Sequence, residues 1–276
     1  METIGSFIII KNEAHWIRAH LNCWLPYLDE MVFLDGNSSD GTLEILKSFQ
    51  KHDEYGTKIL IVEDRDPKDL QDDYVRIFNE ALRALKTDLA IFLHPDMISN
   101  NPQVLREFVD QSEGAISAFS RMRSFAGDPG EPALEIVKGR SDRWKNIYRL
   151  NNPDLGAHYH GWYGADNEDV YFKEITGASH NTYARYFDRY PYEVLDSRLE
   201  ILHFSDVRTY QRRYERMKKS LLNQNVREDF AEETAREHPR VTLKPNPSIT
   251  LSDGEGFTFV PYSGHVPYEK EAACHA

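Results

Sequence analysis

Short apolar runs alternate with longer stretches of mixed polarity along the first 120 residues of the chain. The runs are short and bounded by turn residues, which predicts buried strands at 4–10, 31–34, 58–62, 89–93 and 115–119. The stretches between them predict helices at 14–25, 42–49, 72–85 and 102–110. Strands that alternate with helices are typical of βαβ units, so we expect an α/β fold with a mostly parallel central sheet flanked by helices.

The alternation stops near residue 121, and the second half of the chain follows a different pattern. Apolar segments at 134–137 and 146–150 suggest antiparallel strands, and 151–164 is rich in glycine and aromatic residues, as in a binding loop. Apolar residues at helical spacing predict a helix at 208–226. The stretch 236–276 contains five prolines, so we expect an extended, partly ordered tail there.

Composition narrows the class of protein. The chain has 276 residues and a net charge of −12, which argues against binding nucleic-acid phosphates as its main activity, although it leaves a nucleic acid open as an acceptor. Its two cysteines, Cys23 and Cys274, form neither a disulfide framework nor a zinc cluster. No apolar run reaches the roughly 18–20 residues of a membrane span, and no leader pattern is present. We therefore expect a cytoplasmic enzyme or binding domain.

Polar side chains follow three of the predicted strands. They occupy Lys11, Asn12 and Glu13 after the first strand, 35–42 after the second, and His94, Pro95 and Asp96 after the fourth. Ligands of open α/β sheets bind at the carboxyl ends of the strands, so these loops form a candidate site. For 35–42 a plain turn that caps the next helix is an equal alternative, because Ser, Asn, Asp and Gly favour both.

The usual phosphate-binding loops are missing from the sequence. Neither G-x-G-x-x-G after the first strand nor G-x-x-x-x-G-K-[ST] occurs. A divalent cation is the remaining means of binding phosphate at this acidic edge, because Mg²⁺ and Mn²⁺ bridge carboxylates and diphosphate oxygens.

These motifs together resemble those of family-2 glycosyltransferases, which have the GT-A fold. The resemblance covers about residues 4–225. It rests on the opening strand and turn at 7–13 (FIIIKNE), the acidic loop at 32–42 (VFLDGNSSDGT), the segment 91–96 (IFLHPD) in place of the family's Asp-x-Asp, and 167–170 (NEDV), similar to its acceptor-side motif.

The resemblance implies a role for each part of the chain. Residues 1–120 would bind the nucleotide sugar, 121–235 would bind the acceptor and carry catalysis, and 236–276 would be the tail. Asp96 would bind the metal and Asp169 would be the general base, with Glu168 beside it. His203 is either a second metal ligand or a structural residue. The implied donor contacts are Lys11, Asn12, Glu13, Asp35, Asp40, Arg76, Asn79, His94 and Arg212.

Two further groups have open roles. Trp162 and Tyr163, just before the acidic pair, either stack on the acceptor or simply pack. The basic helix face of Arg212, Arg216 and Lys219 either stabilises the departing diphosphate or is a solvated surface.

The sequence departs from the family pattern at two positions. His94 stands where the family has its first acid, and Gly36 stands where it has the second acid of the loop after the second strand. The family's first acid usually contacts the donor nucleotide or its ribose, and His94 has no carboxylate for that contact. The second change indicates that recognition of the base differs from the usual uridine pattern.

We expect a Mn²⁺- or Mg²⁺-dependent glycosyltransferase that moves a sugar from a nucleoside diphosphate, with UDP as the first candidate, to a hydroxyl of a glycan or small molecule. Inversion follows from a single general base, and non-processive transfer from the absence of the Gln-x-x-Arg-Trp motif. A retaining enzyme, a sugar nucleotidyltransferase and a non-catalytic carbohydrate-binding module are the alternatives. Against the nucleotidyltransferase, this sequence lacks the glycine-rich loop that such enzymes usually carry after the first strand. The carbohydrate-binding module is suggested by the loss of the family's first acid at His94.

Overall fold

The computed structural model describes residues 1–63, 81, 84–111, 117–129, 133–138, 143–149, 194–209, 211, 214, 218, 227–229, 231–232, 257–261 and 264–267. The chain divides into two compact units. The first comprises Met1–Arg121, Arg143–Ile201 and Glu271–Ala276, and the second comprises Met122–Asp142 and Leu202–Lys270.

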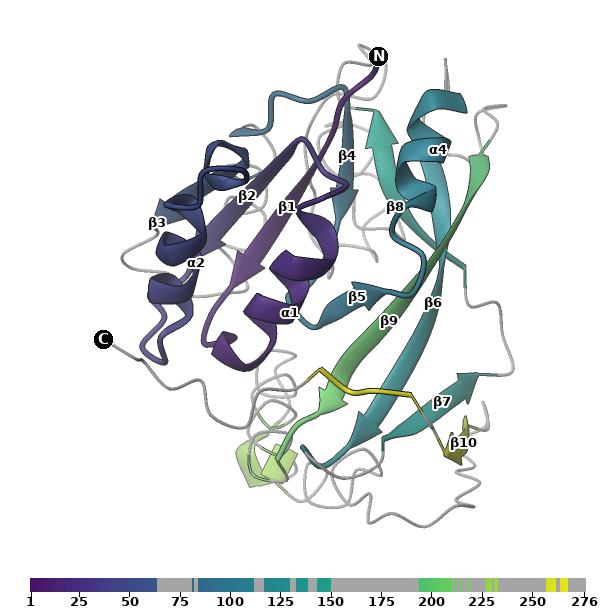
Figure 1. Ribbon diagram of the computed structural model, residues 1–276. Coiled ribbons are helices and arrows are strands. Elements are labelled where there is room, and N and C mark those ends of the chain that lie inside the picture. Colours follow the sequence, from purple (N-terminus) through teal and green to yellow (C-terminus); the bar gives the residue numbers. More distant parts are fainter. Residues whose placement is uncertain are drawn as a thin grey trace. The chain divides into compact units, whose positions relative to one another are not determined.

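The first unit is built on four parallel strands, β1 (Ile4–Ile10), β2 (Glu30–Asp35), β3 (Ile59–Glu63) and β4 (Leu89–Phe92). Their order is β3-β2-β1-β4, so β1 is flanked by β2 and β4 (Figure 1). The register of β1 and β2 runs to Ile10 opposite Asp35, which places the ends of these two strands together. All four strands were expected from the apolar runs, and the α/β class is confirmed.

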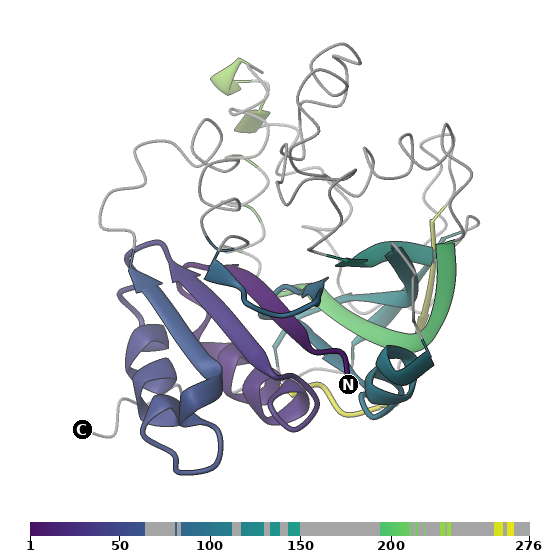
Figure 2. The same cartoon turned by 90° about the horizontal axis from the view of Figure 1, so that it is seen from above.

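The helices of this unit are α1 (Ala14–Trp24), α2 (Thr42–Gln50), the short 3-10 helix η1 (Gly56–Lys58) and α4 (Val104–Gln111). Figures 1 and 2 show α1 and α2 on the same face of the parallel strands. The buried residues of α1 recur at helical spacing, which is why this helix packs one face against the sheet. The helix expected at 72–85 falls mostly outside the described residues.

Further strands extend the first unit. β8 (Arg143–Arg149) pairs antiparallel with β4, and β6 (Ser117–Gly127) pairs antiparallel with β8. The three-residue β5 (Met97–Ser99) follows β4 and pairs with β9 (Val194–Val207). β5 was not expected, because three residues are too few to show a pattern in the sequence.

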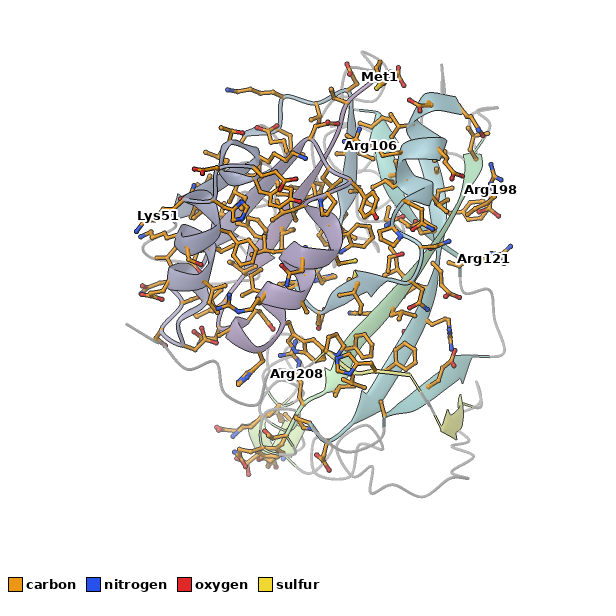
Figure 3. The ribbon with its side chains drawn as sticks, in the orientation of Figure 1. Met1, Lys51, Arg106, Arg121, Arg198 and Arg208 are labelled. Carbon is orange, nitrogen blue, oxygen red and sulfur yellow. The ribbon has the colours of Figure 1, made fainter. Side chains whose placement is uncertain are left out.

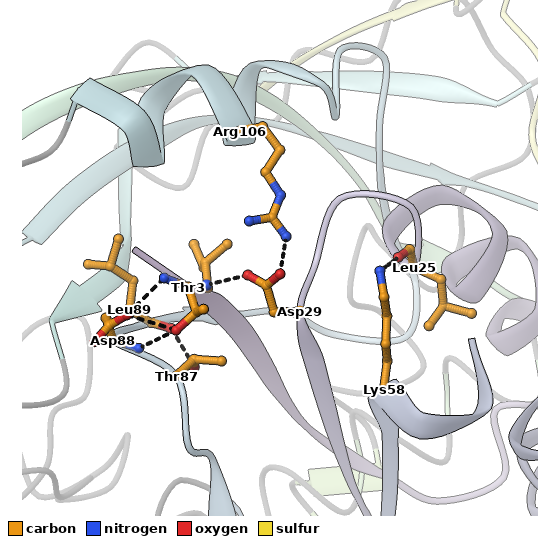
Figure 4. Close-up of polar contacts among 9 residues, drawn as sticks. Thr3, Leu25, Asp29, Lys58, Thr87, Asp88, Leu89 and Arg106 are labelled. Carbon is orange, nitrogen blue, oxygen red and sulfur yellow. Dashed lines mark hydrogen bonds and ion pairs between the residues drawn. The ribbon is translucent and has the colours of Figure 1, made fainter. Parts of the chain in front are cut away.

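Charged side chains are arranged around the periphery of the first unit and at one end of its strands. Lys51, Arg121 and Arg198 are exposed at the surface (Figure 3). Asp29 accepts a hydrogen bond from the Ile4 amide at 2.9 Å and pairs with Arg106 at 2.8 Å (Figure 4). This acid therefore anchors the amino end of β1, opposite the end that carries the candidate site.

The second unit contains the last part of β6, together with β7 (Leu134–Lys138) and β10 (Phe257–Pro261). β7 pairs antiparallel with both β6 and β10. The Phe125 and Phe204 rings stack with centroids 4.9 Å apart. β10 lies in the stretch expected to be an extended tail, and its alternation of aromatic and β-branched residues explains why this part forms a strand.

Candidate functional site

Asp35 is the last residue of β2, and its carboxylate is held by its own loop. The side chain is buried, with an exposed fraction of 2%. Ser38 donates to it twice, from its hydroxyl to Oδ1 at 2.5 Å and from its backbone amide to Oδ2 at 3.0 Å. Asn37 supplies the turn with a left-handed φ of 60°, which Asn tolerates better than most residues. The loop thus fixes the direction of the Asp35 carboxylate.

Asn12 joins the loop after β1 to the loop after β2. Its backbone amide donates to Ser38 Oγ at 2.9 Å, and its side-chain Oδ1 accepts from the Ser39 amide at 2.8 Å. Asn12 itself is left-handed, with a φ of 58°. The two loops that the sequence placed at one edge of the sheet are therefore bonded to one another.

Asp40 binds the amino ends of two helices. Its Oδ2 accepts from the Ala14 amide at 3.1 Å, and its Oδ1 accepts from the amide and hydroxyl of Thr42 at 3.1 and 2.5 Å. The residues at the N-cap positions, Glu13 and Gly41, make no capping bond with their own side chains. Asp40 thus supplies the caps from outside, which supports the capping interpretation of this residue.

The His94, Pro95 and Asp96 loop follows β4, on the other side of β1. A turn closes it, with the Met97 amide donating to the His94 carbonyl at 3.0 Å. The His94 ring is half-buried and lies edge-on to Phe92, with centroids 4.8 Å apart. The Asp96 side chain is almost fully buried, with an exposed fraction of 3%. The loop therefore places a buried carboxylate just beyond the carboxyl end of a central strand.

Lys11 and Glu13 complete the loop after β1. The Lys11 side chain is exposed and lies beside Gly36. The Glu13 amide donates to Thr42 Oγ1 at 2.8 Å, which adds another bond between the two loops. The first unit therefore carries the predicted residues Lys11, Asn12, Glu13, Asp35, Asp40, His94 and Asp96 at the ends of three adjacent strands.

His203 lies in the second unit, within β9. Its side chain is half-buried. β9 begins nine residues before His203, at Val194, and continues to Val207. A metal role for His203 stays a prediction.

The remaining predicted site residues lie outside the described residues. They are the proposed base Asp169 and its neighbour Glu168, the donor contacts Arg76, Asn79 and Arg212, and the acceptor contacts Trp162 and Tyr163. Their roles stay predictions.

Within the described part of the site, Asp96 is the predicted metal ligand in the first unit. Among the described residues, no group of three or more His, Cys, Asp and Glu side chains could hold a metal ion. Asp96 offers carboxylate oxygen, the donor type that Mg²⁺ and Mn²⁺ favour, and a diphosphate would supply further oxygens. The described donor set is therefore compatible with a metal that binds together with a nucleotide.

Three residues that sequence reasoning missed lie on α1, facing the strand that follows Asp96. They are His20, Cys23 and Trp24. Burial lowers the pKa of His20 to about 4, against smaller opposing effects of the hydrogen bond to Met97 and the charge of Asp96. Burial raises the pKa of the Cys23 thiol to about 11. The only signal in the sequence was their spacing along one helical face.

Residues 7–161, more than half of the chain, match the family described as Glycosyl transferase family 2. The chain belongs to this family, and the GT-A fold class expected from the motifs is confirmed. Among curated proteins, none matches the sequence. None of the helices in the described part of the chain has the length and apolar character that a membrane span requires.

Solved structures with related folds were also found. A crystal structure of glucosyl-3-phosphoglycerate synthase from Mycobacterium tuberculosis in complex with Mn²⁺ and UDP-glucose is 20% identical, with a TM-score of 0.34 and coverage of 44% of each chain. S. aureus TarS 1–349 is 13% identical, with a TM-score of 0.43, and the match covers 88% of this chain and 75% of TarS 1–349. The chain thus spans less than half the length of the mycobacterial synthase.

Proposed function

We propose that this chain is a metal-dependent glycosyltransferase that moves a sugar from a nucleoside diphosphate to an acceptor hydroxyl. The observation that carries the proposal is the buried Asp96 carboxylate at the end of β4, in a chain of the glycosyltransferase family and next to polar loops on the neighbouring strands. UDP is the first candidate nucleotide and Mn²⁺ or Mg²⁺ the metal. The enzyme would add one sugar per acceptor, with inversion of the configuration at the anomeric carbon.

The donor half of the reaction falls to the loops of the first unit. Asp96 would hold the metal, which when bound neutralises the charge that develops on the departing diphosphate. Asp35, whose carboxylate is already directed by Ser38, would meet the nucleoside. His94 replaces an acid and would contact the nucleotide as a hydrogen-bond donor or acceptor instead of as a fixed charge.

Removal of the Asp96 carboxylate tests the donor half. Calorimetry with UDP, GDP, CDP and dTDP, each with and without Mn²⁺, should identify one nucleotide that the protein binds more tightly when Mn²⁺ is present. In Asp96→Ala we expect this Mn²⁺ enhancement to fall at least about tenfold, because the cation loses its protein ligand. Asp88→Asn is the matched control, since Asp88 precedes the opposite end of the same strand. An undiminished enhancement in Asp96→Ala would remove this residue from the metal site.

The acceptor half is assigned to Asp169 as the general base. Asp169→Asn keeps the shape of the side chain but cannot accept the acceptor proton, so transfer should fall by about 10²–10⁴-fold while donor binding persists. Glu168→Gln should lose less if Glu168 only positions the acceptor. Full activity in Asp169→Asn with transfer abolished in Glu168→Gln would reverse the two roles.

A non-catalytic carbohydrate-binding module is the second candidate, and the replacement of an acid by His94 favours it. The same calorimetry followed by a donor-hydrolysis assay separates the two. Tight, Mn²⁺-dependent nucleotide-sugar binding with neither hydrolysis nor transfer across a panel of acceptors would favour the module. Product stereochemistry by NMR would distinguish inversion from retention.

A further inference from the structure

The short strand β5 begins directly after Asp96 and is bonded along both of its edges. On one edge it meets β9, where Ser99 Oγ donates to the Glu200 carbonyl at 2.7 Å. Asn101, just beyond β5, accepts from the Glu200 amide at 2.9 Å. A strand of three residues has few backbone bonds of its own, so its position depends on these contacts.

On the other edge β5 meets the side chains of a helix. His20, Cys23 and Trp24 lie on one face of α1, because residues three and four apart share a helical face. The Met97 carbonyl accepts from His20 Nδ1 at 2.9 Å and from Trp24 Nε1 at 3.0 Å. The Ser99 amide donates to Cys23 Sγ at 3.2 Å. Figure 1 shows β5 beside α1. The side chains of α1 thus take the place that a neighbouring strand would occupy.

The chemistry of the His20 contact is defined by its partner. A carbonyl oxygen only accepts, so Nδ1 carries the proton in this bond. His20 is fully buried, and its ring is neutral at neutral pH because its pKa lies near 4. With Trp24 as the second donor, both lone pairs of the Met97 carbonyl are used, and this carbonyl belongs to the residue next to Asp96. Removal of either donor leaves a buried carbonyl with half of its partners.

We propose that His20 and Trp24 are positioning residues for Asp96. By holding the Met97 carbonyl from α1, they fix the backbone that presents the Asp96 carboxylate at the end of β4. This inference rests on the proposed metal role of Asp96. It adds His20 and Trp24, both with an exposed fraction of 0%, to the determinants of metal-dependent nucleotide binding.

Variants that keep the ring but lose the donor test the proposal. They are His20→Phe and Trp24→Phe, and His20→Asn is the rescue because its side-chain amide returns an N–H near the place of Nδ1. Trp16→Phe is the control, the same substitution about two turns earlier on α1, also at a buried tryptophan. For each full-length variant, calorimetry gives the affinity for whichever of UDP, GDP, CDP and dTDP the wild type binds best, with and without Mn²⁺. Thermal melting gives the stability.

We expect the Mn²⁺ enhancement of nucleotide affinity to fall about threefold to tenfold in His20→Phe and in Trp24→Phe, as for the loss of a buried hydrogen bond. Affinity without Mn²⁺ should remain at the wild-type value, His20→Asn should restore most of the enhancement, and Trp16→Phe should leave it unchanged. Hydrogen exchange of the backbone amides of 94 and 96–99 should rise in the two variants that lack the hydrogen-bond donor.

The experiment distinguishes a purely structural role of the two hydrogen bonds from a failure of the proposed metal role of Asp96. Lower melting temperatures with a wild-type Mn²⁺ enhancement in both donor-less variants would make the two bonds merely structural and overturn the proposal. If one variant does not fold, the other gives the same comparison. Absence of any Mn²⁺ enhancement in the wild type would instead overturn the metal role of Asp96, and with it this inference.

Discussion

Gly36 is one of the two positions at which the sequence departs from the family pattern, and the structure leaves room there for a Cβ. A Cβ at this position would lie 3.5 Å from the Ile10 carbonyl oxygen and 3.8 Å from the Lys11 side chain, which are ordinary contacts. Its φ lies outside the left-handed region, where the structure places Gly41 and Gly127. A Cβ therefore fits at this position without backbone strain.

We predict that Gly36→Asp folds normally and shifts the choice of base. A carboxylate beside the base accepts a hydrogen bond from the imide N–H of uracil but repels the N3 lone pair of cytosine. The ratio of UDP to CDP affinity should rise about threefold to tenfold, as expected for one charge-assisted hydrogen bond. Calorimetry measures it, with Gly36→Asn as the neutral control. An equal UDP-to-CDP affinity ratio in the two variants would show that this loop does not contact the nucleobase.

Individual roles were the least predictable part of the site. The sequence places Asp35 and Asp40 in one loop but cannot tell a carboxylate directed by Ser38 from one that caps two helices. That difference arises from bonds to Ala14, which is distant in sequence. His20 shows only as a polar residue on an apolar helix face, because its partner is a backbone carbonyl, which no pattern of side chains reveals.

At the level of elements, Asp40 couples α1 to α2, and its loss should weaken both helices. We predict that Asp40→Ala lowers the free energy of unfolding by about 1–3 kcal/mol, because the amides of Ala14 and Thr42 lose their acceptor. Asp40→Asn keeps one acceptor oxygen and should lose less. Urea unfolding measures the effect, with Glu44→Ala in the first turn of α2 as the control. A loss below about 0.5 kcal/mol in Asp40→Ala would show that water replaces these caps.

The parallel strands and the helices on their face could be predicted because each is long enough to show its own hydrophobic period. β5 and β10 could not, since short strands are defined by the partners they meet in the folded chain. β6 was expected only at 115–119 but runs to Gly127. Polar residues such as Ser120 and Ser124 interrupt its apolar pattern.

At the scale of the whole molecule, the lowered pKa of Asp29 makes the free energy of unfolding depend on pH. Burial alone would raise the pKa of Asp29, but the hydrogen bonds from Arg106 and the Ile4 amide, with the charges of Arg106 and Lys58, outweigh it and lower the pKa. The stabilisation is therefore complete above the ordinary pKa of 3.8 and is lost as the pH falls through the lower value in the folded state. The exposed fractions of Arg106 and Asp29 are 30% and 35%, so the effect is about 0.5–1 kcal/mol.

Urea unfolding of the wild type and Asp29→Asn from pH 7 to pH 3 measures this effect. The variant should be less stable at pH 7, and the gap should narrow below about pH 4 as the wild-type carboxylate becomes protonated. Asp53→Asn, at an exposed acid in the loop after α2, is the control. A gap that stays constant down to pH 3 would assign the effect to the shape of the side chain rather than to its charge.

The bonds between the loops after β1 and β2 also bear on how fast a ligand can be captured. Asn12, Glu13 and Ala14 are tied to Ser38, Ser39, Thr42 and Asp40 before any nucleotide arrives. Preorganised loops lose little conformational entropy when a ligand settles on them. If the proposed nucleotide site lies at this edge of the sheet, we expect association to be limited by diffusion and orientation, and differences in affinity among nucleotides to arise mainly from their dissociation rates.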